Sequence, residues 1–294
     1  MYRRWKDKVA AAWMMAAMLI CVLMILVVAL ALLQKSWPLL SSHSLGQLLF
    51  SAKWRPGQGL FGFQAFIIGT LWVTGMAMLI SVPISLFTAI YLSEYASART
   101  RTIAKPLVDL LAGIPPVVYG LWGVLAIVPF VGKLSERFGS SSTGYSVLAG
   151  AIVLAIMVFP FIISVTEEIL RSVPQEAREA SLSLGSTRWE TIKHVVLKSA
   201  LSGIAAAVVL GFSRAFGETM AVLMVVGNVP KPPASVFDPA YPLPALIANN
   251  YGEMMSIPLY DSALLLAALI LLTVVLGFNI LATVVLRRVE RRLG

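Results

Sequence analysis

The sequence predicts an all-α membrane protein with six transmembrane helices, and three observations lead to that fold class. Hydrophobic residues make up 59% of the 294 positions and charged residues only 13%, about half the fraction usual in soluble domains. Six apolar stretches are each long enough to cross about 30 Å of hydrocarbon as a helix. The basic residues flank these stretches in short clusters. The stretches are residues 10–33, 66–92, 107–131, 145–165, 200–226 and 263–286.

The first stretch, residues 10–33, follows a basic segment at residues 1–9. A secretory signal peptide also begins with basic residues, but its apolar core is only about 7–15 residues long. Because this stretch is much longer, we expect a retained transmembrane helix. It contains Cys21, the only cysteine of the chain, so no intrachain disulfide can form.

The second, fourth and sixth stretches contain no charged residue, and the third contains Asp109 near one end. The glycines and prolines of residues 113–120 also interrupt the third stretch. Broken helices are tolerated in membranes where they line a cavity, and kinks also arise where helices pack together. Both interpretations of this break stay open from the sequence.

The loops expected on the external side differ in composition. Residues 34–62 are rich in glycine and serine, whereas residues 227–261 contain seven prolines. Proline stiffens the chain and removes a hydrogen-bond donor. The second loop is therefore either a shaped external surface or a simple connector.

The Lys and Arg residues are unevenly distributed between the two sides of the membrane. With the N-terminus inside, sixteen of them lie in cytoplasmic segments and six in external segments, and Arg214 lies within the fifth stretch. Cytoplasmic loops of membrane proteins carry an excess of basic residues. Both termini are therefore predicted to be cytoplasmic.

Residues 166–199, between the fourth and fifth stretches, form a long polar segment with charges of alternating sign. Pro174 suits the first turn of a helix, and Gly185 can adopt the positive φ that ends one. Ser186 and Thr187 can cap a second helix. This pattern predicts a helix, a glycine turn and a helix, which form either a solvated hairpin or a docking element for a cytoplasmic partner.

Arg214 and Glu218 lie deep within the fifth stretch, where a charged side chain costs about 2.5–3.5 kcal/mol. Because they are four residues apart, they would share one face of a helix and could pair. One interpretation is an ion pair that holds helices together. The other is a polar path for an anion, since a guanidinium binds phosphate oxygens bidentately.

Residues 179–185, EASLSLG, resemble the EAA-xxx-G motif of permease subunits in bacterial ABC importers. Ser181 replaces the second alanine, and Lys198 stands where a proline usually precedes the next helix, so the start of that helix stays open. The resemblance implies a type I importer permease of MetI-like fold, in which residues 174–199 form a coupling loop for an ATPase. The coupling residues that it implies are Glu176, Glu179, Ala180 and Gly185.

Residues 214–222, RAFGETMAV, resemble the R-A-x-G-E-T-M-A-V segment of phosphate importer permeases. The resemblance to the PstC type of that family lies in residues 54–56, 61–62, 69–71 and 246–249. Residues 113–120 are similar to the G-I-P-S-V-V-Y-G signature of that family, with Pro116 in place of serine. The resemblance implies a pathway for phosphate along the fifth helix. The pathway residues that it implies are Arg214, Glu218, Thr219 and Tyr119.

The same resemblance implies a multi-pass protein of the bacterial cytoplasmic (inner) membrane. It divides the chain into residues 1–65, a first helix with an external loop, and residues 66–294, the permease core. The partners that it implies are a PstA-like second permease, a PstB-like ATPase dimer, an external PstS-like phosphate-binding protein, inorganic phosphate and the lipid bilayer.

Several other classes of protein do not fit the sequence. The chain has no G-xxxx-GK[ST] loop, so we expect no enzyme activity here and ATP hydrolysis on a partner chain. It has no HExxH or CxxC, so neither a metal nor a cofactor is expected, and its basic residues do not form the stripe that nucleic acid requires. Two alternatives stay open: an importer of another oxyanion, such as sulfate or molybdate, and an ATP-independent transporter or channel, which would not need residues 179–185.

Overall fold

A computed structural model describes residues 2–139, 142–253 and 256–293. The side chains of residues 1–5 and 285–294, which include the terminal arginines counted for the topology, lie outside the described set. Within the described residues, six helices are long and apolar enough to cross a membrane, and this confirms the predicted number of spans. They are Lys6–Ser42, Gln64–Tyr95, Pro116–Arg137, Val147–Arg171, Arg188–Phe216 and Tyr260–Val284.

Most of the described residues are helical, and they also contain one short hairpin of two strands and a long non-helical loop at residues 226–242. Three of the elements, η2, η3 and η4, are π-helical turns that continue a neighbouring α-helix, and η1 is a 3-10 turn. In chain order the elements are α1 (Tyr2–Ser42), α2 (Leu45–Phe50), β1 (Trp54–Arg55), η1 (Pro56–Gln58), β2 (Leu60–Phe61), α3 (Gln64–Ile90), η2 (Tyr91–Tyr95), α4 (Ala98–Gly113), α5 (Pro116–Trp122), η3 (Gly123–Ile127), α6 (Val128–Arg137), α7 (Val147–Arg171), α8 (Gln175–Ser183), α9 (Arg188–Thr191), η4 (Ile192–Val196), α10 (Leu197–Phe216), α11 (Met220–Val225), α12 (Leu243–Asn250) and α13 (Tyr260–Leu293).

The helices α3 and α7 pack against each other at the centre of the bundle. Val73 and Ala77 of α3 share a buried cluster with Ala151 and Leu154 of α7. Small residues allow the two backbones to approach, since a Cβ atom on Gly150 would lie only 3.3 Å from Cγ1 of Val73. This close pair of long helices forms the frame on which the other spans are arranged.

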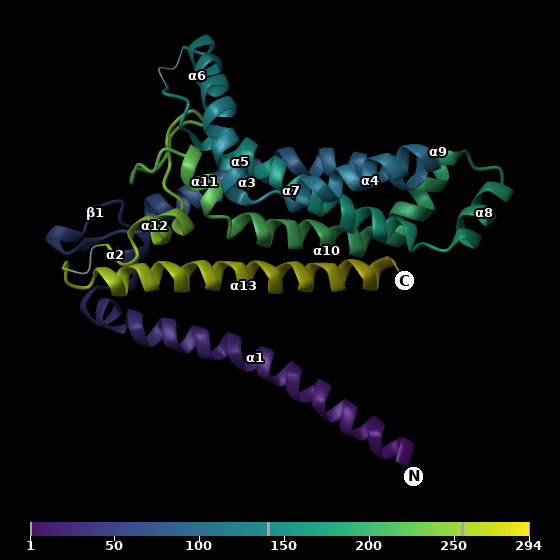
Figure 1. The fold of residues 1–294 in the computed structure, drawn as a ribbon, viewed down its shortest axis with the longest axis horizontal. Coiled ribbons are helices and arrows are strands. Elements are labelled where there is room, and N and C mark those ends of the chain that lie inside the picture. The colour runs from purple at the N-terminus through teal and green to yellow at the C-terminus, as the bar shows by residue number, and fades with distance from the viewer. Residues whose placement is uncertain (1, 140–141, 254–255, 294) are drawn as a thin grey trace.

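Both ends of the chain lie at the same end of the bundle, together with α8 and α9, whereas β1, α2 and α12 lie at the opposite end and α6 projects sideways from the bundle (Figure 1). α1 diverges from α13 toward its N-terminus, so that apolar side chains such as Trp13 and Met24 are more than half exposed. The arrangement agrees with termini on one side of a membrane. That this side is cytoplasmic remains a prediction from the charge distribution.

The third span differs from its predicted position at residues 107–131. α4 ends at Gly113, and the spanning helix begins only at Pro116 and continues to Arg137. A residue that precedes proline is pushed out of the helical region, and Ile114 and Pro115 are both extended, with ψ of 128° and 140°. The predicted interruption at residues 113–120 is confirmed, and Asp109 belongs to the separate helix α4.

The fifth span also differs from the predicted stretch at residues 200–226. The helix starts earlier, at Arg188, continues through the π-helical turn η4 and ends at Phe216. Lys198 keeps the backbone N–H that a proline would lack, so it lies within the continuous helix rather than breaking its start. After Phe216 the chain leaves the helix, and α11 resumes at Met220.

The proline-rich loop returns onto the end of the bundle instead of only linking two helices. The backbone N–H groups of Val147 and Leu148 donate to the carbonyls of Asp238 and Val236, at 2.9 Å each, and that of Ala240 donates to Val226 at 3.0 Å. The bonds from Val147 and Leu148 occupy the first amide groups of α7, which a helix cannot satisfy internally. The loop is therefore packed on the bundle and is more than a simple connector, and its role as a shaped external surface stays a prediction.

Candidate functional site

The predicted pathway residues Arg214, Glu218 and Thr219 lie at the break between α10 and α11. Glu218 follows the end of α10, and its carboxylate accepts hydrogen bonds from the backbone N–H groups of Thr219, at 3.1 Å, and Ala221, at 3.3 Å. These amides belong to the start of α11 and have no partner within that helix. Glu218 therefore caps α11, and a carboxylate at this position is favoured by the helix dipole.

The prediction that Arg214 and Glu218 share one helical face is wrong, because the helix ends between them. No ion pair joins the two residues in the described part of the chain. The local backbone explains the difference: Gly217 ends α10, and the following residues turn before Met220 begins the next helix. Each residue instead lies at the helix end whose partial charge it complements.

Arg214 occupies the last turn of α10 and is exposed in the isolated chain. Its guanidinium carbon lies 5.5 Å from the centre of the Phe161 ring, which holds it by a cation–π contact. Exposure of an arginine to hydrocarbon is strongly unfavourable. Arg214 must therefore face a polar space or another chain, and its donors are available to an anion.

Tyr119 lies near this break, but its hydroxyl is not free to contact an anion as the Arg214 guanidinium is. Its ring is buried, and its hydroxyl donates to the carbonyl of Leu111 at 2.8 Å, across the break between α4 and α5. It shares a buried cluster with Ala221 of α11. Its helix packs tightly on α11, because a Cβ atom on Gly120 would lie 3.2 Å from Cα of Ala221. Tyr119 therefore positions the wall beside Arg214.

A small cavity lies beside Glu218, on the side that faces α3. Its lining includes Thr70, Thr74 and Phe216, and its volume is about 10 Å³. A volume of this size is about that of one probe sphere and holds at most a single water. A phosphate ion cannot enter it, whereas the exposed side of Arg214 is open to a ligand.

The polar segment after α7 folds as the sequence predicts. α8 covers Gln175–Ser183, Gly185 follows with φ of 88°, and Thr187 caps α9. Thr187 and Glu190 form a capping box, in which the Glu190 carboxylate accepts from the Thr187 N–H at 2.8 Å. The one difference is Pro174, which lies just before the first turn of α8 rather than inside it.

The predicted coupling residues lie on the outer surface of this hairpin. Glu176, Glu179, Ala180 and Gly185 are all exposed. Leu184, at the tip, is 89% exposed, although a large apolar side chain gains free energy when it is buried. The outer surface of the hairpin is thus acidic and apolar, as expected of a surface that another protein covers.

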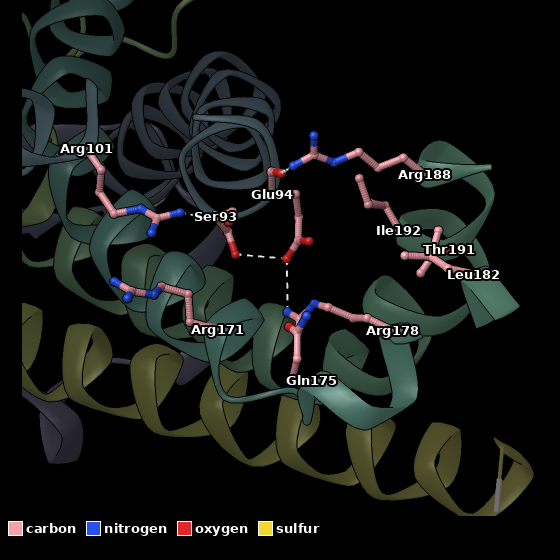
Figure 2. A pocket seen from close by; sticks show the side chains of 10 residues that line it. All are labelled: Ser93, Glu94, Arg101, Arg171, Gln175, Arg178, Leu182, Arg188, Thr191 and Ile192. Atoms are coloured by element: carbon pink, nitrogen blue, oxygen red, sulfur yellow. Dashed lines mark hydrogen bonds and ion pairs between the residues drawn. The ribbon is translucent and has the colours of Figure 1, made fainter. Parts of the chain in front are cut away.

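The sequence did not predict the residues on the inner side of the hairpin, which face the end of α3. Figure 2 shows a cavity between the end of α3 and the α8–α9 hairpin, with a volume of about 550 Å³. Glu94 lies at its centre, and four arginines from α4, α7, α8 and α9 surround it. The signal available in the sequence was a single acidic residue directly after the second apolar stretch. The lining residues are Ser93, Glu94, Arg101, Arg171, Gln175, Arg178, Leu182, Arg188, Thr191 and Ile192.

Neither site offers the ligands of a metal centre. Among the described residues, no three His, Cys, Asp or Glu side chains lie close enough together to hold a metal ion. Arginine binds anions and does not coordinate metals. The chemistry that the two sites can provide is therefore anion contact at Arg214 and protein docking at the hairpin.

Six spans, a broken fifth helix and a helical hairpin between the fourth and fifth spans define a membrane permease with the type I ABC importer fold. The chain belongs to the family described as binding-protein-dependent transport system inner membrane component, whose model matches residues 81–293. It is accordingly a multi-pass inner-membrane protein.

The similar proteins support the same conclusion over most of the chain. It is 34% identical to the phosphate transport system permease protein PstC of Mesorhizobium japonicum, over 98% of this chain and 92% of that protein. It is 41% identical to the probable ABC transporter permease protein YqgH of Bacillus subtilis, over 70% of this chain and 66% of that protein. A solved bacterial ABC transporter involved in alginate import superposes with a TM-score of 0.61, at 19% identity, over 97% of this chain and 99% of the other.

Proposed function

We propose that this chain is the PstC-type permease subunit of an ATP-driven phosphate importer and forms half of its translocation pathway. The observation that carries the proposal is Arg214, whose guanidinium is exposed at the break of the fifth span and has no carboxylate partner among the described residues. Guanidinium matches the geometry of phosphate oxygens and stays charged at any physiological pH. The likeness to the PstC protein of Mesorhizobium japonicum supports phosphate as the anion.

The four pathway residues act differently in this proposal. Arg214 contacts the passing anion, and the exposed Thr219 hydroxyl, which now donates to the Gly217 carbonyl at 3.2 Å, lies beside the same break. Glu218 holds the start of α11, and Tyr119 holds the neighbouring wall. The Glu218 carboxylate accepts from the backbone N–H groups of Thr219 and Ala221, so it forms no ion pair with Arg214 among the described residues.

The other half of the pathway and the energy source lie on partner chains. A PstA-like permease would cover the exposed side of Arg214, and a PstB-like ATPase dimer would bind the outer surface of the α8–α9 hairpin through Glu176, Glu179, Ala180 and Gly185. An external PstS-like protein would deliver phosphate. In this scheme residues 66–294 form the permease core, and residues 1–65 add a peripheral helix and an external loop.

The experiment that tests this function is uptake by a reconstituted complex. The chain would be co-expressed with its neighbouring permease and ATPase subunits and placed in vesicles with the phosphate-binding protein. Uptake of labelled phosphate that requires ATP and resists excess sulfate and molybdate supports the proposal. Uptake of another oxyanion in place of phosphate would overturn the substrate, and uptake without ATP would overturn the coupling.

A further inference from the structure

Glu94 lies at the end of α3 that faces the α8–α9 hairpin, inside the π-helical turn η2 that terminates the helix. Its side chain is only 10% exposed, and one carboxylate oxygen lies 3.0 Å from a guanidinium nitrogen of Arg178, which is 14% exposed. Ser93 donates a further hydrogen bond to the same oxygen at 3.0 Å. A shielded pair of this kind is little weakened by salt, unlike a pair on the surface.

Arg178 joins the coupling hairpin to both central helices. It lies on α8, and besides Glu94 on α3 it donates to the carbonyl of Leu170 at the end of α7, at 2.8 Å, and to the carbonyl of Val173. The planar guanidinium presents several donors in a rigid fork, so one side chain can hold three groups at once. Arg178 turns inward, away from the exposed surface that carries Glu179.

Two further arginines hold the backbone at the same end of α3. Arg188 of α9 donates to the Glu94 carbonyl, and its guanidinium carbon lies 5.0 Å from the centre of the Tyr95 ring. Arg101 of α4 donates to the carbonyl of Leu92 at 2.8 Å. The last carbonyls of a helix lack internal partners and carry partial negative charge. Arg188 from the hairpin and Arg101 from α4 therefore supply hydrogen-bond donors to the last carbonyl groups at this end of α3.

The other end of α3 reaches the break that carries the candidate pathway. Thr70 and Thr74 line the small cavity with Phe216 and Glu218, and the Thr70 hydroxyl accepts from the backbone N–H of Leu243 at 2.9 Å. From residue 74 to residue 94 the helix spans about 30 Å. One helix thus connects the coupling hairpin to the α10–α11 break.

We propose that Glu94 is the residue through which movement of the α8–α9 hairpin is passed to α3, with Arg178 as its partner. The inference rests on the proposed function, because it assumes that an ATPase moves the hairpin. The Glu94–Arg178 pair makes the hairpin and the end of α3 move as one body, so that force on the hairpin reaches Phe216 and Glu218 through α3. Glu94 and Arg178 are positioning residues and touch neither nucleotide nor phosphate.

The first test compares the Glu94→Gln variant with the wild type in the reconstituted complex. Glutamine keeps the size and an acceptor oxygen but removes the charge. We expect the ATPase to co-purify and to hydrolyse ATP, while the phosphate moved per ATP falls about tenfold, as expected when one charged hydrogen bond is weakened. The matched control is Glu168→Gln, an exposed carboxylate of α7 with no ion pair among the described residues. An unchanged ratio in Glu94→Gln would overturn the proposal.

A second test does not depend on transport, and its wild-type measurement can overturn the proposal even if the Glu94→Gln complex fails to assemble. Spin labels would be placed at Phe87→Cys on α3 and Ser183→Cys on α8, both exposed, in a Cys21→Ser background that removes the only native cysteine. In the wild-type complex we expect the same distance between the labels with and without trapped ATP, and a broadened distribution after Glu94→Gln. A wild-type distance that changes with ATP would overturn the rigid connection. A complex that shows the constant distance but moves no phosphate would instead refute the proposed function alone.

Discussion

Arg214 and Glu218 are separated by a helix break, so that Arg214 ends α10 while Glu218 caps α11 through the N–H groups of Thr219 and Ala221. The two charged side chains therefore have different roles. The arginine is left exposed with its donors available, and the carboxylate is held by the backbone. We therefore expect loss of the Arg214 charge to lower phosphate uptake and loss of the Glu218 side chain to lower stability.

Replacing Glu218 by alanine should destabilise the protein by about 1 kcal/mol, the usual cost of losing an N-terminal cap. Glu218→Gln should cost less, because its amide oxygen can still accept from Ala221. Thermal unfolding of the purified protein in detergent measures both values. If glutamine preserves stability but abolishes phosphate uptake, then the charge itself is needed for transport and capping is not its main role.

Gly144 precedes α7 with φ of 90°, and a Cβ atom there would lie 2.1 Å from the Val128 carbonyl oxygen. Gly144→Ala should therefore lower the free energy of unfolding by about 2 kcal/mol or more, because backbone strain and a clash with backbone add together. Gly139 is the matched control, since it has φ of 73° but open space around its Cα. If the two variants lose the same free energy of unfolding, then the close contact between α6 and the segment before α7 contributes nothing to stability.

Leu184 should be an anchor of the ATPase surface, since it is 89% exposed at the tip of the coupling hairpin. Leu184→Asp would place a charge where an apolar contact is expected and should weaken binding of the ATPase by about 2 kcal/mol or more. Co-purification of the ATPase with the tagged permease measures the loss. Ser172→Asp, an exposed position at the end of α7, should retain the ATPase. Retention by both variants would place the docking surface elsewhere.

The hydrophobic pattern was sufficient to predict six spans, because bilayer thickness fixes the length of an apolar helix. The α8–α9 hairpin was also predictable, since Gly185 and Thr187 carry local signals for a helix end and a cap. The breaks were harder. Pro115 and Pro116 did mark the interruption of the third stretch, but apolar composition alone did not show that the span begins after them.

The charged contacts within the candidate sites could not be derived from spacing. A separation of four residues suggested that Arg214 and Glu218 share a face, yet the turn at Gly217 places them on different helices. Glu94 and Arg178 are 84 residues apart, and only the packing of α3 beside the hairpin brings them together. Long-range ion pairs of this kind depend on tertiary structure, which no local pattern encodes.

The most direct test of the central claim is the initial rate of ATP-dependent phosphate uptake by the Arg214→Ala complex. Loss of a charged hydrogen bond to phosphate corresponds to roughly a tenfold to hundredfold effect, so we predict a fall of that size with normal assembly. Arg214→Lys should recover only part of the rate, because lysine keeps the charge without the bidentate fork. Arg137→Ala, an exposed arginine at the end of α6, should transport normally. Wild-type uptake by Arg214→Ala would contradict the account and leave Arg214 a purely structural residue.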